Sequence, residues 1–257
     1  MNSKECAHQD AEAIAEIYNQ HGETYHTSRT KKGRFFNEYL EMPATLSLIP
    51  ENLTGKTVLD AGCGSGIYTR EMAKRGAKVI AVDISKTMIE IARQELSQYK
   101  DIAYQVGNIY ELTVKNQSVD WIICNYVLEN VFDIDAVFEE FKRVLKPGGC
   151  CVYSISHPLR GTAEKEFLDG HEIWKLKNYY DKGVRMSDFG QGMKVKKYKR
   201  TLSDYINASI NPGFLIEHML EPQPILLGKK NDVVAYEAAM RLPQLLIVKM
   251  RAILNKA

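Results

Sequence analysis

The sequence predicts an α/β fold with a mostly parallel central sheet. Short apolar runs alternate with amphipathic segments through the middle of the chain, and two of these runs end in an acidic residue. Strands that alternate with helices form βαβ units, whose right-handed crossovers place helices against the sheet. The 257 residues suffice for one large domain of this class, or for one domain with a cap.

Seven apolar runs are the strand candidates. They are short and are bounded by turn residues or helical segments, which is typical of strands that lie buried in a sheet. In chain order the candidates are Thr57–Asp60, Lys78–Asp83, Asp101–Val106, Val119–Asn125, Cys150–Ser156, Phe214–Leu220 and Gln244–Met250.

Helical periodicity fills the intervals between these runs. Ser85 is a candidate N-cap, and the apolar face that follows it is formed by Met88, Ile91, Ala92 and Leu96. A second helix ends at the basic and helix-breaking segment Lys146–Gly149. Its apolar stripe is formed by Ile134, Val137, Phe138, Phe141, Val144 and Leu145. A third candidate helix, Ile67–Arg75, ends at Gly76.

Two segments do not follow this alternation. Residues 1–50 have a helical pattern with apolar side chains on one face. Residues 157–205 connect two strands and are rich in aromatic residues, and a connection of this length in a compact domain is usually functional. We therefore expect a helical cap over 1–50 and a domain over 51–257, whose insertion 157–205 completes the cap over the carboxyl edge of the sheet.

Charge and composition exclude several classes of protein. The net charge is +2, from 34 basic and 32 acidic residues, so we expect no overall attraction to nucleic acid or to an anionic membrane. No apolar run reaches the ~18 residues that span a bilayer, and the N-terminus has no hydrophobic signal region. The five cysteines include no C-x-x-C pair, and their odd number predicts neither a disulfide framework nor a zinc site. We expect a cytoplasmic protein without a metal, either a monomer or a homodimer.

A glycine-rich loop follows the first strand candidate. Gly62, Gly64 and Gly66 permit a tight turn and let the backbone approach a ligand closely. The next helix begins directly after them, so its free N–H groups point toward the same place. The spacing differs from the dinucleotide pattern G-x-G-x-x-G, whose third glycine would fall at Ile67. The loop indicates a nucleotide-like ligand, and the alternative is a purely structural strand–helix turn.

Asp83 ends the second strand candidate, 17 residues after Gly66. A carboxylate at this position can accept hydrogen bonds from both hydroxyls of a ribose. The alternative is that Asp83 only helps to cap the next helix, a role that Ser85 can fill alone.

Five ordered motifs resemble the class I S-adenosylmethionine (SAM)-dependent methyltransferase family. They are Val58–Gly66, Ala81–Ser85, Gly107–Ile109, Ser118–Asn125 and Arg143–Gly149. Further segments resemble a small-molecule subgroup, methyltransferase type 11 or 25, and these are Tyr39–Ala44, Ser154–Pro158, Arg200–Tyr205 and Leu242–Lys249. The resemblance implies a Rossmann-like, seven-stranded, mostly parallel sheet with its last strand antiparallel and helices on both faces. It also implies SAM as methyl donor and S-adenosylhomocysteine as product.

The resemblance places the SAM site on the loops at the carboxyl ends of the strands. The cofactor-binding residues that it implies are Asp60, Gly62, Cys63, Gly64, Gly66, Asp83, Ile84, Met88, Asn108, Ile109, Asn125, Tyr126, Tyr18 and Tyr39. The adenine motif of the family usually carries Asp where this chain has Asn108, whose amide can either accept or donate a hydrogen bond.

Two residues at strand ends are candidates for a catalytic role. Methyl transfer from a sulfonium is an in-line displacement, for which the protein mostly supplies proximity and, where the acceptor carries a proton, a general base. His157 titrates near neutrality, and Glu129 could take a proton or bind a cationic amine. The structural alternatives are a histidine held in place before Pro158 and a solvated acid at a helix start.

We expect methyl transfer to N, O, S or C of a small-molecule metabolite, because the long aromatic insertion favours a closed pocket. The basic run Lys194–Arg200 would suit an RNA phosphate or an anionic small substrate, although a surface strand with lysines at an exposed edge is the favoured explanation. The alternatives are an RNA or protein methyltransferase and a SAM-binding protein without transferase activity. No separate RNA-binding domain is visible, so nucleic acid is not the expected partner.

Overall fold

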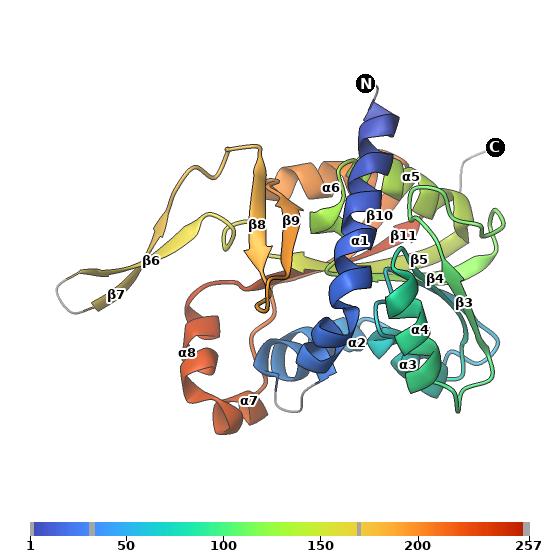
Figure 1. Ribbon diagram of the computed structural model, residues 1–257, viewed down its shortest axis with the longest axis horizontal. Helices are drawn as coiled ribbons and strands as arrows, with labels where there is room; N and C mark the ends of the chain where they lie inside the picture. The colour runs from blue at the N-terminus through green and yellow to red at the C-terminus, as the bar shows by residue number, and fades with distance from the viewer. Residues whose placement is uncertain (1–2, 31–33, 169–170, 254–257) are drawn as a thin grey trace.

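The computed structural model describes residues 3–30, 34–168 and 171–253, and a seven-stranded sheet forms its centre (Figure 1). The strand order is β10-β11-β5-β4-β1-β2-β3. The strands are β1 (Thr57–Ala61), β2 (Lys78–Asp83), β3 (Ile102–Val106), β4 (Val119–Asn125), β5 (Leu145–Ser156), β10 (Phe214–Leu220) and β11 (Leu245–Ala252). β11 runs antiparallel to both β5 and β10, while the other pairings are parallel. The mostly parallel sheet with an antiparallel last strand is confirmed.

The start of β5 differs from the prediction. Lys146–Gly149 was expected to separate a helix from a strand that begins at Cys150. Instead the helix ends at Val144, and Leu145 already pairs with Val119 of β4. The register then shifts before the next pair, so the helix-breaking segment lies inside β5 as an irregularity of its ladder.

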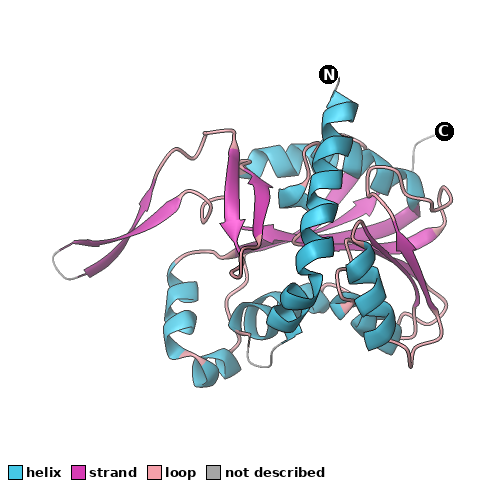
Figure 2. Cartoon of the chain, in the orientation of Figure 1, coloured by secondary structure: helices cyan, strands magenta, loops and turns pink. Residues whose placement is uncertain are grey.

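Helices cover both faces of the sheet (Figure 2). Those that alternate with the strands are α3 (Ile67–Lys74), α4 (Lys86–Glu95), α5 (Ile134–Val144), α6 (Leu202–Ile210), α7 (Leu226–Asn231) and α8 (Val233–Arg241), with the short 3-10 helix η2 (Leu128–Asn130) after β4. Phe138 and Phe141 of α5 pack on one face with Tyr153 of β5, and all three are fully buried. Tyr68 and Met72 of α3 pack on the other face. Ser85 caps α4 as predicted, since its hydroxyl accepts the N–H of Met88.

The N-terminal segment is helical, as expected. It contains α1 (Ser3–Thr30), the π-helix η1 (Asn37–Glu41) and α2 (Met42–Ser47). α1, dark blue in Figure 1, runs beside α4. Asn19 fastens the two helices, because its side-chain oxygen accepts from the Ser85 hydroxyl at 2.8 Å and from the Thr87 backbone N–H at 3.2 Å. α1 is thereby held next to the loop that follows β2.

The segment 157–205 folds into two β-hairpins and the start of α6. The first pairs β6 (Ala163–Leu168) with β7 (His171–Leu176), and the second pairs β8 (Val184–Asp188) with β9 (Lys194–Tyr198). β6–β7 extends away from the body of the protein, whereas β9 contacts α1 (Figure 1). An ion pair between Lys196 and Asp10 joins β9 to α1. In the part of the chain that the structure describes, no helix is both long and apolar enough to cross a membrane.

Candidate cofactor and acceptor site

A cavity of about 150 Å³ lies at the carboxyl ends of β1, β2 and β4, with α1 forming part of its wall. Twelve of the predicted cofactor-binding residues line it. They are Tyr18, Asp60, Gly62, Cys63, Gly64, Asp83, Ile84, Met88, Asn108, Ile109, Asn125 and Tyr126. Residues from five separate parts of the chain therefore meet at the edge of the sheet where ligands of open α/β folds bind.

The glycine loop takes a backbone shape that requires glycine. Gly62 and Gly64 have φ angles of +77° and +54°. A Cβ on Gly62 would lie 2.3 Å from Cγ2 of Val127, whereas a Cβ on Gly64 would meet only Cε of Met88, at 3.5 Å. The position of Gly64 thus leaves room beside the backbone, and that room belongs to the cavity.

Gly66 differs from Gly62 and Gly64 in its surroundings. It is absent from the lining of the cavity among the described residues, and it stands at the N-terminus of α3 with φ +86°. A Cβ there would lie 2.7 Å from Cδ1 of Leu96. Gly66 therefore allows close packing of α3 against the end of α4, and its contact with the cofactor stays a prediction.

Asp83 is held with both carboxylate oxygens in use. Oδ2 accepts the backbone N–H of Gly64 at 2.8 Å, and Oδ1 accepts that of Ser85 at 2.9 Å. Burial raises the pKa of Asp83, and these hydrogen bonds oppose the rise. Because Ser85 caps α4 itself, Asp83 is not needed as the helix cap and keeps lone pairs for a ligand.

Asp60 is the second acid of this cavity. Its Oδ2 accepts from the hydroxyl of Thr69 at 2.6 Å, and its side chain is almost fully buried. Burial raises the pKa of Asp60 to about 7, against the hydrogen bond from Thr69, and the charge of Asp83 adds to the rise. A cationic ligand beside these two acids would favour their ionised forms.

Two asparagines present buried amide atoms without a protein partner. Both Nδ2 and Oδ1 of Asn125, and Oδ1 of Asn130, are buried and unpaired among the described residues. Both side chains line the cavity. Since unpaired buried polar atoms cost folding free energy, they fit a ligand that supplies both donors and acceptors there. SAM has such groups, as well as a positively charged ammonium group that would favour ionised Asp60.

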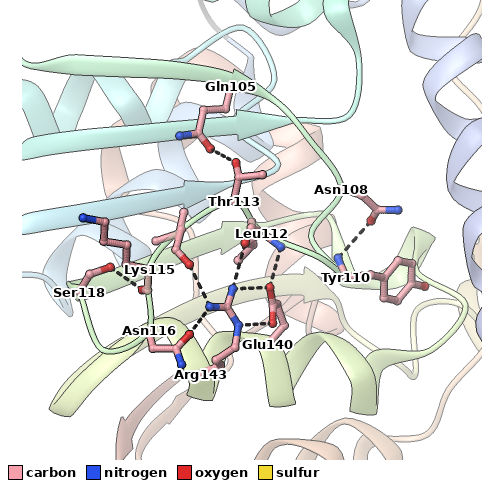
Figure 3. Close-up of polar contacts among 11 residues, drawn as sticks. Gln105, Asn108, Tyr110, Leu112, Thr113, Lys115, Asn116, Ser118, Glu140 and Arg143 are labelled. Carbon is pink, nitrogen blue, oxygen red and sulfur yellow. Dashed lines mark hydrogen bonds and ion pairs between the residues drawn. The ribbon is translucent and has the colours of Figure 1, made fainter.

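The loop after β3 carries Asn108 and is held against α5 at Leu112 (Figure 3). Oδ1 of Asn108 accepts the backbone N–H of Tyr110 at 3.1 Å, which leaves its NH₂ group to donate to a ligand. Glu140 accepts the N–H of Leu112 at 2.6 Å, and Arg143 donates to the Leu112 carbonyl at 2.9 Å (Figure 3). With Oδ1 engaged in this way, we expect Asn108 to act toward a ligand as a donor.

A second cavity, of about 280 Å³, shares five residues with the first. The shared wall consists of Tyr18, Tyr25, Arg29, Tyr126 and Asn130. The ring centroids of Tyr18 and Tyr25 are 5.2 Å apart in an edge-to-face arrangement, and the Arg29 guanidinium lies 5.4 Å from the centre of the Tyr126 ring. Burial raises the pKa of Tyr18 well above its ordinary value, so its phenol stays protonated.

The β8–β9 hairpin contributes to the second cavity. Phe189, in the turn between the two strands, and Lys197 of β9 both line it. The Phe189 ring lies 5.6 Å from that of Tyr25, edge to face. Lys197 and Lys196 both form ion pairs with buried or partly buried acids, so these two lysines do not guard an exposed edge.

Neither candidate catalytic residue lines either of these two cavities. His157 is buried with Nε2 2.8 Å from Oε1 of Glu221, and its Nδ1 accepts the N–H of Leu159 at 3.3 Å. Glu129 accepts the N–H of Ser156 at 3.1 Å and forms an ion pair with Lys197. The alternative of a solvated Glu129 is wrong, because this side chain is buried. It reaches the second cavity only through Lys197.

One predicted cofactor residue lies elsewhere, and several lining residues were missed. Tyr39 packs 6.0 Å from the Phe35 ring and against Gly228, and it lines neither cavity. Arg29 and Asn130 line both cavities without having been singled out. Asn130 follows β4, so its place after a strand end was a usable signal, whereas Arg29 stands inside a long polar helix with nothing in the sequence to mark it.

Comparison with known proteins gives the same assignment. A family model described as "Methyltransferase domain" matches residues 59–153. The crystal structure of an S-adenosylmethionine-dependent methyltransferase from Mesorhizobium loti has a TM-score of 0.73 and 30% sequence identity, covering 82% of this chain and 97% of that one.

Two curated relatives match the central region. The malonyl-[acyl-carrier protein] O-methyltransferase of Yersinia pestis is 33% identical over 145 residues, which is 56% of this chain and 51% of that protein. The ubiquinone biosynthesis O-methyltransferase of Coxiella burnetii is 37% identical over 119 residues, which is 45% of this chain and 51% of that protein. The match therefore spans about half the length of each of these two relatives. Because the likeness to the Mesorhizobium enzyme runs through both the sequence and nearly the whole of that structure, this chain belongs to the SAM-dependent methyltransferases.

Proposed function

We propose that the chain transfers a methyl group from SAM to a nitrogen, oxygen, sulfur or carbon atom of a small-molecule metabolite. The observation that carries this proposal is the second cavity, which adjoins the first along five shared residues. Its volume of about 280 Å³ is near the lower end of pockets for small organic ligands, which run from roughly 300 Å³ upward. A compact acceptor fits this space better than a nucleic acid or a folded protein does.

The cofactor cavity offers polar partners for the ribose, the adenine and the ammonium group of SAM. Asp83 has lone pairs for the ribose hydroxyls, and the NH₂ group of Asn108 can donate to the adenine edge. Asp60 lies among the residues that would face a cationic group, and Asn125 offers an unpaired donor and acceptor. When bound, SAM supplies an electrophilic methyl group on a sulfonium, whose leaving thioether is neutral.

The chain's own contribution to the reaction is orientation. The shared wall, with the protonated phenol of Tyr18 and the ring of Tyr126, separates the two cavities and would align the acceptor with the methyl group. α1 and β8–β9 serve as the cap that excludes water. We assign Glu129 a positioning role, since its carboxylate holds Lys197 at the second cavity. His157, which faces Glu221, then has a structural role.

Transfer is tested by incubating the protein with methyl-labelled SAM and a cell extract, and by following the label by size. We expect the label in compounds of low mass. Label in RNA or in protein would instead support the macromolecular alternatives. Binding of SAM measured by calorimetry, with no transfer to any fraction, would show that the protein binds the cofactor without turnover.

The affinity for SAM is expected to fall below pH 7. Burial raises the pKa of Asp60 from its ordinary value of 3.8 to about 7. The ligand-free folded protein therefore loses stability as the pH rises from 3.8 to about 7, where this buried side chain gives up its proton. A cationic ligand favours ionised Asp60, so binding takes a proton off this side chain at low pH. Calorimetry between pH 5 and 8 should show full affinity above pH 7 and a loss of about tenfold per pH unit below it.

Two variants check the origin of this pH dependence. Asp60→Asn should bind SAM weakly with little change over the same range. Thr69→Val removes the hydrogen bond that opposes the rise in the pKa of Asp60, so the decline should begin at a higher pH. An unaltered pH profile in Asp60→Asn would remove this side chain from the explanation.

Replacing Asp83 with alanine is expected to weaken SAM binding by about 10- to 100-fold, because a hydrogen bond to a charged group contributes roughly 1.5–3 kcal/mol. Asp120→Ala is the matched control: its carboxylate also accepts a backbone N–H, from Thr57 at 2.9 Å, but at the start of β4. We expect unchanged affinity in the control. Wild-type affinity in Asp83→Ala would exclude Asp83 from the ribose site.

A further inference from the structure

The second cavity carries an excess of positive charge. Arg29, Arg34, Arg160 and Lys197 all line it, and no Asp or Glu is among its described lining residues. Lys197 is neutralised by Glu129, which is buried behind it. The three guanidinium groups remain, and among the described residues none of them forms a salt bridge to a carboxylate within 4.0 Å. The charge of this cavity is therefore unbalanced.

The three arginines are held by neutral partners. Arg29 donates to Oδ1 of Asn37 at 2.7 Å, and Arg34 makes a long contact of 3.4 Å with the hydroxyl of Ser28. The Arg160 guanidinium lies 5.7 Å from the centre of the Phe36 ring. These contacts orient the guanidinium groups without cancelling their charge, and they leave N–H donors unused.

The arginines also repel other cations nearby. Burial lowers the pKa of Arg34, and the charge of Arg29 lowers it further. Burial likewise lowers the pKa of Arg160, with a further contribution from Arg185. Like charges gathered at a cavity are unfavourable unless an anion joins them.

Glu41 does not compensate the cavity. It acts on Arg29 through its charge, but it lines neither cavity. Its carboxylate already accepts hydrogen bonds from the hydroxyls of Tyr68 at 2.5 Å, Ser154 at 2.9 Å and Thr45 at 3.0 Å. This buried acid joins η1 to α3 and β5. The positive charge of the three arginines is therefore available to an anionic ligand.

We propose that the methyl acceptor carries a carboxylate or phosphate group on a compact aromatic or apolar body, and that Arg29, Arg34 and Arg160 bind its anionic group. The planar guanidinium forms paired hydrogen bonds with both kinds of anion. Phe35, Phe36 and Phe189 supply apolar and aromatic surface for the body of the acceptor. This inference rests on the proposed function, because it takes the second cavity as the acceptor site.

The extract assay can be arranged to test the charge of the acceptor. The metabolite extract is passed over an anion exchanger at pH 8 before the reaction, and the retained and unretained fractions are each incubated with the protein and labelled SAM. Separation before the reaction matters, because methylation of the anionic group itself would remove its charge. We expect labelled product from the retained fraction alone. Product from the unretained fraction alone would overturn the inference while leaving methyl transfer to a small molecule intact.

Binding of simple probes gives a second, independent readout. The complex with S-adenosylhomocysteine is titrated by calorimetry with benzoate, phenyl phosphate and the neutral benzamide. We expect at least one of the two anions to bind about tenfold or more tightly than benzamide. The comparison of benzoate with phenyl phosphate then distinguishes a carboxylate from a phosphate acceptor. Equal binding of all three probes, or binding of neither anion, would overturn the inference.

Paired variants connect the preference to these arginines. Arg34 and Arg160 line only the second of the two cavities, so the double variant Arg34→Gln/Arg160→Gln should keep its affinity for SAM and lose the tenfold preference for the anion. Arg93→Gln is the matched control, since this exposed guanidinium also lies over a ring, 5.1 Å from the centre of Tyr104, but lines neither cavity. An anion preference that survives in the double variant would overturn the assignment. If neither extract fraction yields product, the proposed function fails. The binding of the three probes then tests, independently of methyl transfer, whether the cavity prefers an anion.

Discussion

Replacing Lys197 with methionine is expected to destabilise the protein by about 3–5 kcal/mol, which is the usual cost of removing one partner of a buried ion pair. The side chains of Lys197 and Glu129 are 11% and 4% exposed, and Glu129 lies within η2, the short helix that follows β4. Without the lysine, Glu129 must either stay buried as an uncompensated anion or take up a proton. Urea unfolding followed by circular dichroism measures the loss.

Two further variants separate charge from packing. Glu129→Gln/Lys197→Met removes both charges and should recover most of the lost stability, because a neutral pair leaves no buried ion behind. Lys199→Met removes a nearby lysine whose ion pair with Asp181 is much more exposed, so its loss should stay within about 1 kcal/mol. A similar loss for Lys199→Met and Lys197→Met would show that burial of the Lys197 pair is not what stabilises this region.

The substitution Gly64→Val is expected to abolish measurable SAM binding. The valine side chain would project into the space beside the loop, where only Met88 lies within 4 Å of the new Cβ. The left-handed backbone of Gly64, with φ +54°, adds a cost of about 1–2 kcal/mol for a residue with a side chain. Calorimetric titration with SAM measures the first effect, and thermal unfolding measures the second.

Gly55→Val is the matched control for this backbone cost. Gly55 has φ +75° in the turn before β1, and a Cβ there meets nothing within 4 Å. Both variants should therefore lose similar stability, but only Gly64→Val should lose the cofactor. Retention of wild-type affinity in Gly64→Val would refute the placement of SAM against this loop.

The central sheet was predictable because its signals are local. β2 was predicted at Lys78–Asp83 and is observed there, since a buried parallel strand is a continuous apolar run that a polar residue ends. Ser85 caps α4 for an equally local reason. The hairpins β6–β7 and β8–β9 were not predicted as pairs, apart from a strand in the basic run that became β9. Their apolar pattern is weak because they lie outside the sheet core.

The site was predictable where a strand end or a loop motif determines position. Asp83 and Gly64 follow strands, and the topology alone brings them together. His157 also follows a strand, but its direction depends on Glu221, which comes from a distant part of the chain. Tyr39 lines neither cavity and lies against Gly228 of α7, which is also distant in the chain. Side-chain direction in these places is decided by contacts that no short sequence pattern contains.

The attachment of α1 has a consequence for how the two ligands bind. No α1 residue belongs to the apolar core clusters of the described chain, and its contacts include the hydrogen bonds of Asn19 and the ion pair of Asp10 with Lys196. A helix held in this way opens at a lower free energy than the sheet unfolds. Because α1 supplies Tyr18, Tyr25 and Arg29 to the wall of both cavities, we expect the proposed cofactor and acceptor each to favour the same placement of this helix. Thermodynamic linkage then requires the two effects to be equal: the factor by which the cofactor raises the affinity for the acceptor is also the factor by which the acceptor raises the affinity for the cofactor.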